Sequence, residues 1–143
     1  MKKPVNLLSF PAFNHVRVGV WYKTKSTRSL LRKFDGIKQG YESGDFPNAL
    51  DVTHTEVCEI FLPVKEDVDI CHQVTDMMQG ENWSPNGEAK HLISSLDLSH
   101  TSICENDVIQ IGDKFYALFE SQFQDVSSFV NLVYQDENDG HSA

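Results

Sequence analysis

The loop before the clearest predicted hairpin carries the residue types of a hydrolytic site. His100, Thr101 and Ser102 could supply a base and a hydroxyl nucleophile, and Asp107 could orient the histidine. Loop hydroxyls more commonly bond the local backbone, and an aspartate that begins a strand needs no catalytic role. The sequence also lacks the glycine-rich nucleophile elbow of a hydrolase. We therefore interpret this loop as a polar turn and keep a small hydrolase as an alternative.

Histidines and cysteines could supply a zinc site, but their spacing is not that of a structural one. Structural zinc sites usually contain a tight pair of ligands a few residues apart. The best local pair is His100 and Cys104, and no second pair has matching spacing. His54 and Cys58 share a face of a predicted strand but lie about 13 Å apart at strand rise. The remaining candidates are Cys71, His72 and His91. We expect no metal and no cofactor.

The acidic residues are too scattered for a paired-carboxylate active site and instead predict a charged surface. Asp67, Asp69 and Asp76 fall on a predicted helix, and Glu81 follows it. Two interpretations stay open. They form a solvated helix face, or an anionic surface that imitates a phosphate backbone and occupies a basic groove on another protein.

Trp83 lies in the loop after this helix and has two interpretations as well. It is a hot-spot anchor for a partner, or an aromatic ring that caps the edge of the core. The candidate binding residues are therefore Asp67, Asp69, Asp76, Glu81, Trp83 and His100.

The charge of the chain is distributed unevenly. Residues 1–38 carry nine of the twelve Lys and Arg and one acid, a net charge of +8. Residues 39–143 carry three bases and twenty acids, a net charge of −17, which leaves −9 overall. A nucleic-acid binder is usually basic overall, so direct nucleic-acid binding is disfavoured. The basic residues between 17 and 38 keep a nucleic-acid-binding accessory protein as an alternative.

Length and composition predict one domain and a cytosolic location. The chain has 143 residues and contains no apolar run of the roughly 18 residues that a membrane span requires. Its beginning lacks the apolar core of a secretory signal. Three cysteines are an odd number, which favours reduced thiols. We expect a single domain over residues 1–135 and an acidic, disordered tail over residues 136–143.

Hydrophobic periodicity predicts the elements that position these residues. Alternation indicates strands at 16–22 and 52–62, and helical spacing indicates helices at about 27–42, 65–79 and 88–96. The inward stripe expected for the second helix is Val68, Cys71, His72, Thr75 and Met78.

The hairpin is the strongest local signal in the chain. Strands at 107–110 and 114–119 flank Gly112 and Asp113, which suit a tight two-residue turn. A turn and a final strand at about 129–134 follow. The order of elements predicts an α+β fold, with a mostly antiparallel sheet and two or three helices packed on one face.

The C-terminal third resembles small YodL-like domains of bacteria, phages and plasmids. In these, a His-Ser/Thr-Ser loop leads into an Asp-Val-Ile/Val strand, a Tyr-containing strand and an aromatic-ended segment. The matching residues are His100, Thr101, Ser102, Asp107, Val108, Ile109, Tyr116, Phe123 and Phe129. The chain departs from the pattern at Glu105, Asn106 and Gln122, where small residues or Gly are common. The resemblance implies no enzymatic activity and favours a small accessory protein of a phage or mobile element.

Together these features predict a non-enzymatic, acidic α+β protein that binds another protein in the cytosol. Its most specific form is an inhibitor that mimics nucleic acid and blocks a host nucleic-acid-binding or defence complex. The expected partner is a host protein or complex with a basic groove.

Overall fold

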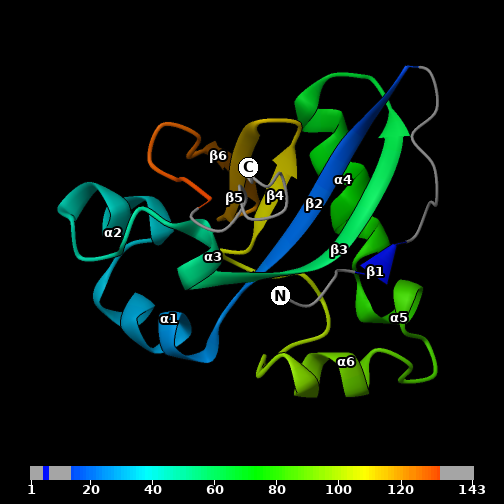
Figure 1. The fold of residues 1–143 in the computed structure, drawn as a ribbon, viewed down its shortest axis with the longest axis horizontal. Helices are drawn as coiled ribbons and strands as arrows, with labels where there is room; N and C mark the ends of the chain where they lie inside the picture. The colour runs from blue at the N-terminus through cyan, green and yellow to red at the C-terminus, as the bar shows by residue number, and fades with distance from the viewer. Residues whose placement is uncertain (1–4, 7–13, 133–143) are drawn as a thin grey trace, which may run out of the picture.

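The structure, a computed structural model, describes residues 5–6 and 14–132. These form a six-stranded sheet with the order β1-β3-β2-β4-β5-β6 (Figure 1). β1 runs parallel to β3, and all other neighbouring strands are antiparallel. The strands are β1 Val5–Asn6, β2 His15–Lys23, β3 His54–Pro63, β4 Val108–Ile111, β5 Lys114–Phe119 and β6 Gln122–Asp125. The predicted α+β class with a mostly antiparallel sheet is confirmed.

Helices lie over both faces of this sheet. They are α1 Lys25–Leu30, η1 Leu31–Lys33, α2 Ile37–Ser43, α3 Leu50–Thr53, α4 Asp67–Met77, α5 Gly80–Trp83 and α6 Lys90–Ser95. In the part of the chain that the structure describes, none of them is long and apolar enough to cross a membrane.

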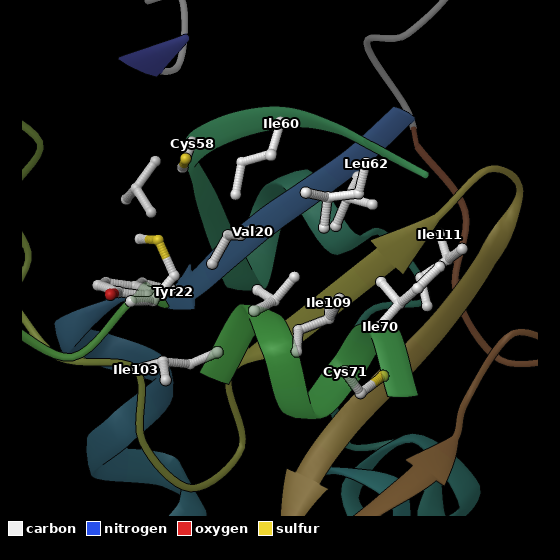
Figure 2. Packing of buried hydrophobic residues seen from close by; sticks show 14 of the residues in the cluster. Val20, Tyr22, Cys58, Ile60, Leu62, Ile70, Cys71, Ile103, Ile109 and Ile111 are labelled. Atoms are coloured by element: carbon white, nitrogen blue, oxygen red, sulfur yellow. The ribbon is translucent and has the colours of Figure 1, made fainter. Parts of the chain in front are cut away.

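The larger core lies between α4, α6 and one face of the sheet. Alternation in β2 sends Val18, Val20 and Tyr22 into it, and all three are fully buried. Figure 2 shows side chains of β2, β3 and β4 gathered around Ile70 and Cys71 of α4. Burial of this apolar surface is the main stabilising contribution to this layer.

The inward stripe of α4 differs from the predicted one. Ile70, Cys71, Val74 and Met78 are buried, whereas Val68 is 52% exposed. His72 is exposed as well, and Thr75 is half-buried. Residues 68 and 70 lie about 200° apart on a helix, so burial of Ile70 turns Val68 outward. The prediction was wrong for Val68 and His72.

The second core lies on the opposite face of the sheet. Trp21 of β2 and Val108 of β4 meet Ile37 and Tyr41 of α2 and Leu50 of α3. The sheet is therefore covered on both faces and not on one face as predicted, with α4 and α6 over one and η1, α2 and α3 over the other.

The predicted helix over 27–42 is broken into α1, η1 and α2. Phe34 is extended, and Gly36 has φ of 96°, a conformation that favours glycine. A Cβ atom on Gly36 would lie 3.0 Å from the ring of Phe119. The Ile37 N–H donates to Oδ1 of Asn106 at 2.9 Å, which fixes the start of α2. Tertiary contacts therefore impose the break.

Two strand predictions also need correction. Val52 and Thr53 belong to α3, and β3 begins at His54. The last strand is β6 at Gln122–Asp125, in the segment where a turn was expected. Of the predicted strand at 129–134, Asn131 forms an isolated parallel bridge with Ala49, while residues 133 and 134 lie outside the described residues. The tail predicted at 136–143 also lies outside them.

The predicted hairpin is confirmed. β4 and β5 pair with Ile111 opposite Lys114, and Gly112 and Asp113 form the two-residue turn. Val108 and Ile109 are fully buried, and Tyr116 and Leu118 are half-buried.

Candidate functional site

The acidic surface predicted from the sequence lies on α4 and α5. Asp69 and Asp76 of α4 and Glu81 of α5 are exposed, and none of them forms a salt bridge with another described residue. Asp69 and Asp76 lie about 10 Å apart along the helix at 1.5 Å per residue. Asp67 differs from these, because it is half-buried and accepts a hydrogen bond from the Tyr116 hydroxyl. The free carboxylates therefore follow the outer side of α4.

Several cations elsewhere in the described chain are paired or lie away from this surface, although the exposed Lys65 comes just before α4. Arg17 contacts Glu56 and Glu59, each at 2.6 Å, and Lys25 lies 3.2 Å from Asp97. The exposed Arg32 and Lys33 belong to η1, between α1 and α2. In Figure 1, α1 and α2 lie at one end of the molecule and α4 and α5 at the other. The exposed cations of η1 thus lie away from the acidic surface on α4 and α5 (Figure 1).

A groove of about 300 Å³ lies between α4 and the β5–β6 hairpin. Its lining residues are Val68, Cys71, His72, Tyr116, Ser121, Gln122 and Phe123. The His72 ring packs edge-on against Phe123, with ring centroids 5.1 Å apart. Sequence reasoning missed this groove, because it placed Val68 and His72 inside the core and had no strand at residues 122–125.

Trp83 is the last residue of α5, not part of a loop as predicted, and lies at the edge of the larger core. Its ring is half-buried and packs against that core, and its Nε1 donates to the Thr101 carbonyl oxygen at 3.0 Å. This position corresponds to the second interpretation given above, an aromatic ring that caps the core edge.

His100 joins a buried polar network centred on Asp107. The Asp107 carboxylate is wholly buried and accepts from Nε2 of His100 at 2.8 Å. It also accepts from the backbone N–H groups of Lys23 and Cys104, each at 2.9 Å. The His100 ring stacks on Tyr22 with centroids 4.6 Å apart. Burial alone would lower the pKa of His100, but hydrogen bonds to Asp107 and Cys104 and their negative charge raise it to about 9.

Lys23 supplies the countercharge of this network. Its Nζ donates to Sγ of Cys104 at 3.0 Å and to the Glu105 carbonyl at 2.7 Å. It lies 3.6 Å from Oδ1 of Asp107, and the Lys23 residue is itself buried. The buried carboxylate therefore faces two cationic groups, as a charge at this depth requires.

One group of side chains has the spacing of metal ligands. The ligand atoms of His100, Cys104 and Asp107 lie within 4.8 Å of one another, and no other such group of three occurs among the described residues. The Lys23 ammonium already contacts the Cys104 sulfur. A metal ion would have to displace this buried cation, so the set fits a lysine better than it fits a metal.

The other histidines and cysteines considered as metal ligands do not belong to this group. His54 is buried, hydrogen-bonded to Thr53 and Asn106, and its pKa is lowered to about 4 by burial. Burial raises the pKa of the Cys58 and Cys71 thiols to about 12. His72 and His91 are exposed.

Hydrogen bonds to the Ser102 hydroxyl and the Thr101 carbonyl anchor the His100 loop. Ser102 Oγ accepts from the Gly80 N–H at 2.7 Å, which attaches the loop to the start of α5. The Thr101 carbonyl accepts from the Tyr22 hydroxyl at 2.6 Å. Ser102 thus caps α5 rather than facing a base, and these contacts favour the polar-turn interpretation.

Comparison with family models, with curated proteins and with solved structures gave no match. The resemblance to YodL-like domains therefore stays a prediction from the sequence.

Proposed function

We propose that this chain is a non-enzymatic module of the cytosol that binds a basic surface of another protein through the acidic side of α4 and α5. The observation that carries the proposal is the exposure of Asp69, Asp76 and Glu81 without an ion pair among the described residues. Carboxylates that are exposed and unneutralised generate the long-range field that attracts a basic partner.

The position of Asp76 supports the proposal as well, because the stability of α4 does not explain an acid there. Acids in the first turn of a helix are favoured by the dipole, which accounts for Asp67 and Asp69. Asp76 lies in the last turn of α4, where no basic residue accompanies it. A negative charge there costs about 0.3–1 kcal/mol. An unfavourable charge at this exposed position supports a role outside the folded chain.

The most specific form of this proposal is mimicry of nucleic acid. A groove that binds DNA or RNA presents Lys and Arg to phosphates, and carboxylates can occupy the same cations. The overall charge of −9 and the resemblance to domains of phages and mobile elements support an inhibitor of a host nucleic-acid-binding or defence complex.

The test begins with capture of a partner by the tagged chain from a host lysate, followed by binding kinetics with the purified partner. The triple variant D69K/D76K/E81K should weaken binding at least about tenfold, mainly through the association rate. The control E42K/D45K/D113K makes the same change in net charge at exposed acids outside α4 and α5. It should change affinity less than about twofold.

The alternatives give different outcomes. A nucleic-acid binder would bind free DNA or RNA and lose it on R32E/K33E, whereas a hydrolase would lose an activity on His100→Ala. Equal effects of the two triple variants on partner binding would refute recognition by α4 and α5.

A further inference from the structure

We propose that the partner segment is an extended strand with one apolar residue that is flanked, two positions away on each side, by basic residues. It pairs with the outer edge of β6 and places an apolar side chain in the groove beside α4. This inference rests on the proposed function and names the form of the basic segment that the acidic surface recognises.

β6 offers a strand edge. It is the last strand in the sheet order, and among the described residues it pairs only with β5. Edge strands usually carry Lys, Pro or a bulge that prevents pairing with another chain. The sequence of β6 is Gln-Phe-Gln-Asp, so a single charge at Asp125 is its only such protection.

The register shows which backbone groups point outward. The Val126 N–H donates to the Phe115 carbonyl at 2.9 Å, and hydrogen-bonded pairs recur every second residue along antiparallel strands. The turn indicates the same alternation of hydrogen-bonded pairs. Positive φ at Glu120 and Ser121 defines a two-residue type I′ turn, which is closed by the hydrogen-bonded pair of Phe119 and Gln122. Gln122 and Gln124 therefore bond β5. The N–H and C=O groups of Phe123 and Asp125 face the outer edge.

The groove begins at this edge. Phe123 packs on the α4 side of the sheet, against His72, and Val68 is 52% exposed beside it. A strand added to β6 sends every second side chain to that side of the sheet. One such side chain can enter the groove of about 300 Å³ and cover Val68, while backbone hydrogen bonds form along β6.

Charge selects the other residues of the strand. Asp67 and Asp69 flank Val68 in the sequence, and Asp69 and Asp76 lie one turn to either side of His72 on α4. The apolar lining is thus bordered by carboxylates. Lys or Arg two residues from the inserted apolar residue would lie on the same side of the sheet and reach them, and an acidic strand would be repelled.

Fluorescence anisotropy with a labelled Thr-Lys-Thr-Val-Thr-Lys-Thr peptide, whose Val and two Lys residues share one face of a strand, tests the inference on the intact chain. The matched Glu-Val peptide, with Glu in place of both Lys residues, should bind at least about tenfold more weakly. A bound strand uses the N–H groups of alternate residues. N-methylation of one alternate set should therefore weaken binding about tenfold, and methylation of the other set should change it little. Equal binding of the two methylated peptides would overturn strand addition.

Val68 provides the variant test, with Val52 as its matched control. The two valines are 52% and 50% exposed, on α4 and α3, so neither Val→Ser change should disturb the fold. Val68→Ser should weaken peptide binding about tenfold, and Val52→Ser less than about twofold. Equal behaviour of the two variants would overturn the assignment of the groove.

The same variants separate this inference from the proposed function. If D69K/D76K/E81K weakens binding of the purified partner but Val68→Ser does not, the acidic surface is used and the strand inference is wrong. In the opposite case, Val68→Ser and one methylation pattern weaken binding, the charge reversals do not, and the Glu-Val peptide binds as tightly as the Lys-containing one. Recognition of a basic partner is then wrong.

Discussion

Nε2 of His100 lies 2.8 Å from Oδ2 of Asp107, and the carboxylate that it contacts is wholly buried. The His100 ring stacks on the ring of Tyr22, and the Lys23 ammonium lies 3.6 Å from the other oxygen of the carboxylate, Oδ1. The network connects the end of β2 with the loop that enters β4. Deprotonation of His100 should therefore change the free energy of unfolding of the whole chain.

Stability should fall as the pH rises through about 9, the pKa of His100 in the folded chain. This pKa lies above the ordinary value of 6.5, so the stabilising contribution is complete below about pH 6.5 and is lost on deprotonation at higher pH. The loss should be about 1–2 kcal/mol after allowance for solvent near the ring. Urea unfolding at several pH values measures it. His100→Ala should flatten this profile, whereas replacement of the exposed His91 should leave it unchanged.

Excess chelator should leave the melting temperature unchanged. The Lys23 ammonium lies 3.0 Å from Sγ of Cys104 and supplies the positive charge at the only described group of three metal-type ligands. Differential scanning fluorimetry with EDTA, and with added zinc, measures the effect. Cys104→Ser serves as the control and should respond to neither reagent. A drop of several degrees with EDTA in the parent chain would show that a metal contributes to folding.

Replacement of Gly36 should cost more than replacement of Gly44. Both glycines have positive φ, 96° and 83°, so Ala brings backbone strain at each, about 1 kcal/mol. Only at Gly36 does the added Cβ meet another group, the Phe119 ring at 3.0 Å. Gly36→Ala should therefore destabilise the chain by about 1–2 kcal/mol more than Gly44→Ala. Equal midpoints in urea would contradict the packing of the α1–α2 break against β5.

Ile109→Ala should destabilise the fold by about 2–5 kcal/mol, because the side chain is fully buried in the larger core. Tyr116→Phe should cost less, about 1–2 kcal/mol, since it removes a hydrogen bond to Asp67 and keeps the ring. Val52→Ala, at an exposed position, should stay within about 0.5 kcal/mol of the parent. Chemical denaturation of the three variants gives the ranking.

Partner affinity should fall steeply with salt. Raising ionic strength from about 0.1 M to about 1 M shortens the screening length from about 10 Å to about 3 Å. The association rate should fall most, because attraction by exposed carboxylates acts before contact. Surface plasmon resonance at the two salt concentrations separates the two rates. An affinity independent of salt would argue against the acidic surface and for an apolar contact.

Local patterns determined much of the sheet. The alternation of Val18, Val20 and Tyr22 predicts β2, and Gly112 and Asp113 predict the two-residue turn of the β4–β5 hairpin. Both signals are contained within a few consecutive residues, so no distant contact could alter them. The burial of β3 was harder to predict. The register shift opposite Val20 and Trp21 places the consecutive residues Val57 and Cys58 in one core.

Other features depended on residues far apart in the sequence. The break at Gly36 requires Asn106 and Phe119, and the outward turn of Val68 follows from the preference for Ile70 in the core. The sequence by itself determined the hairpin, the fold class and the uneven distribution of charge along the chain, because each is carried by neighbouring residues or by composition. Only the tertiary structure decided the groove between α4 and β6 and the meeting of Lys23 with His100 and Asp107. Those contacts join segments that are far apart in the sequence, and hydrophobic periodicity describes each segment separately. The packing of the two cores determines how far apart such segments lie.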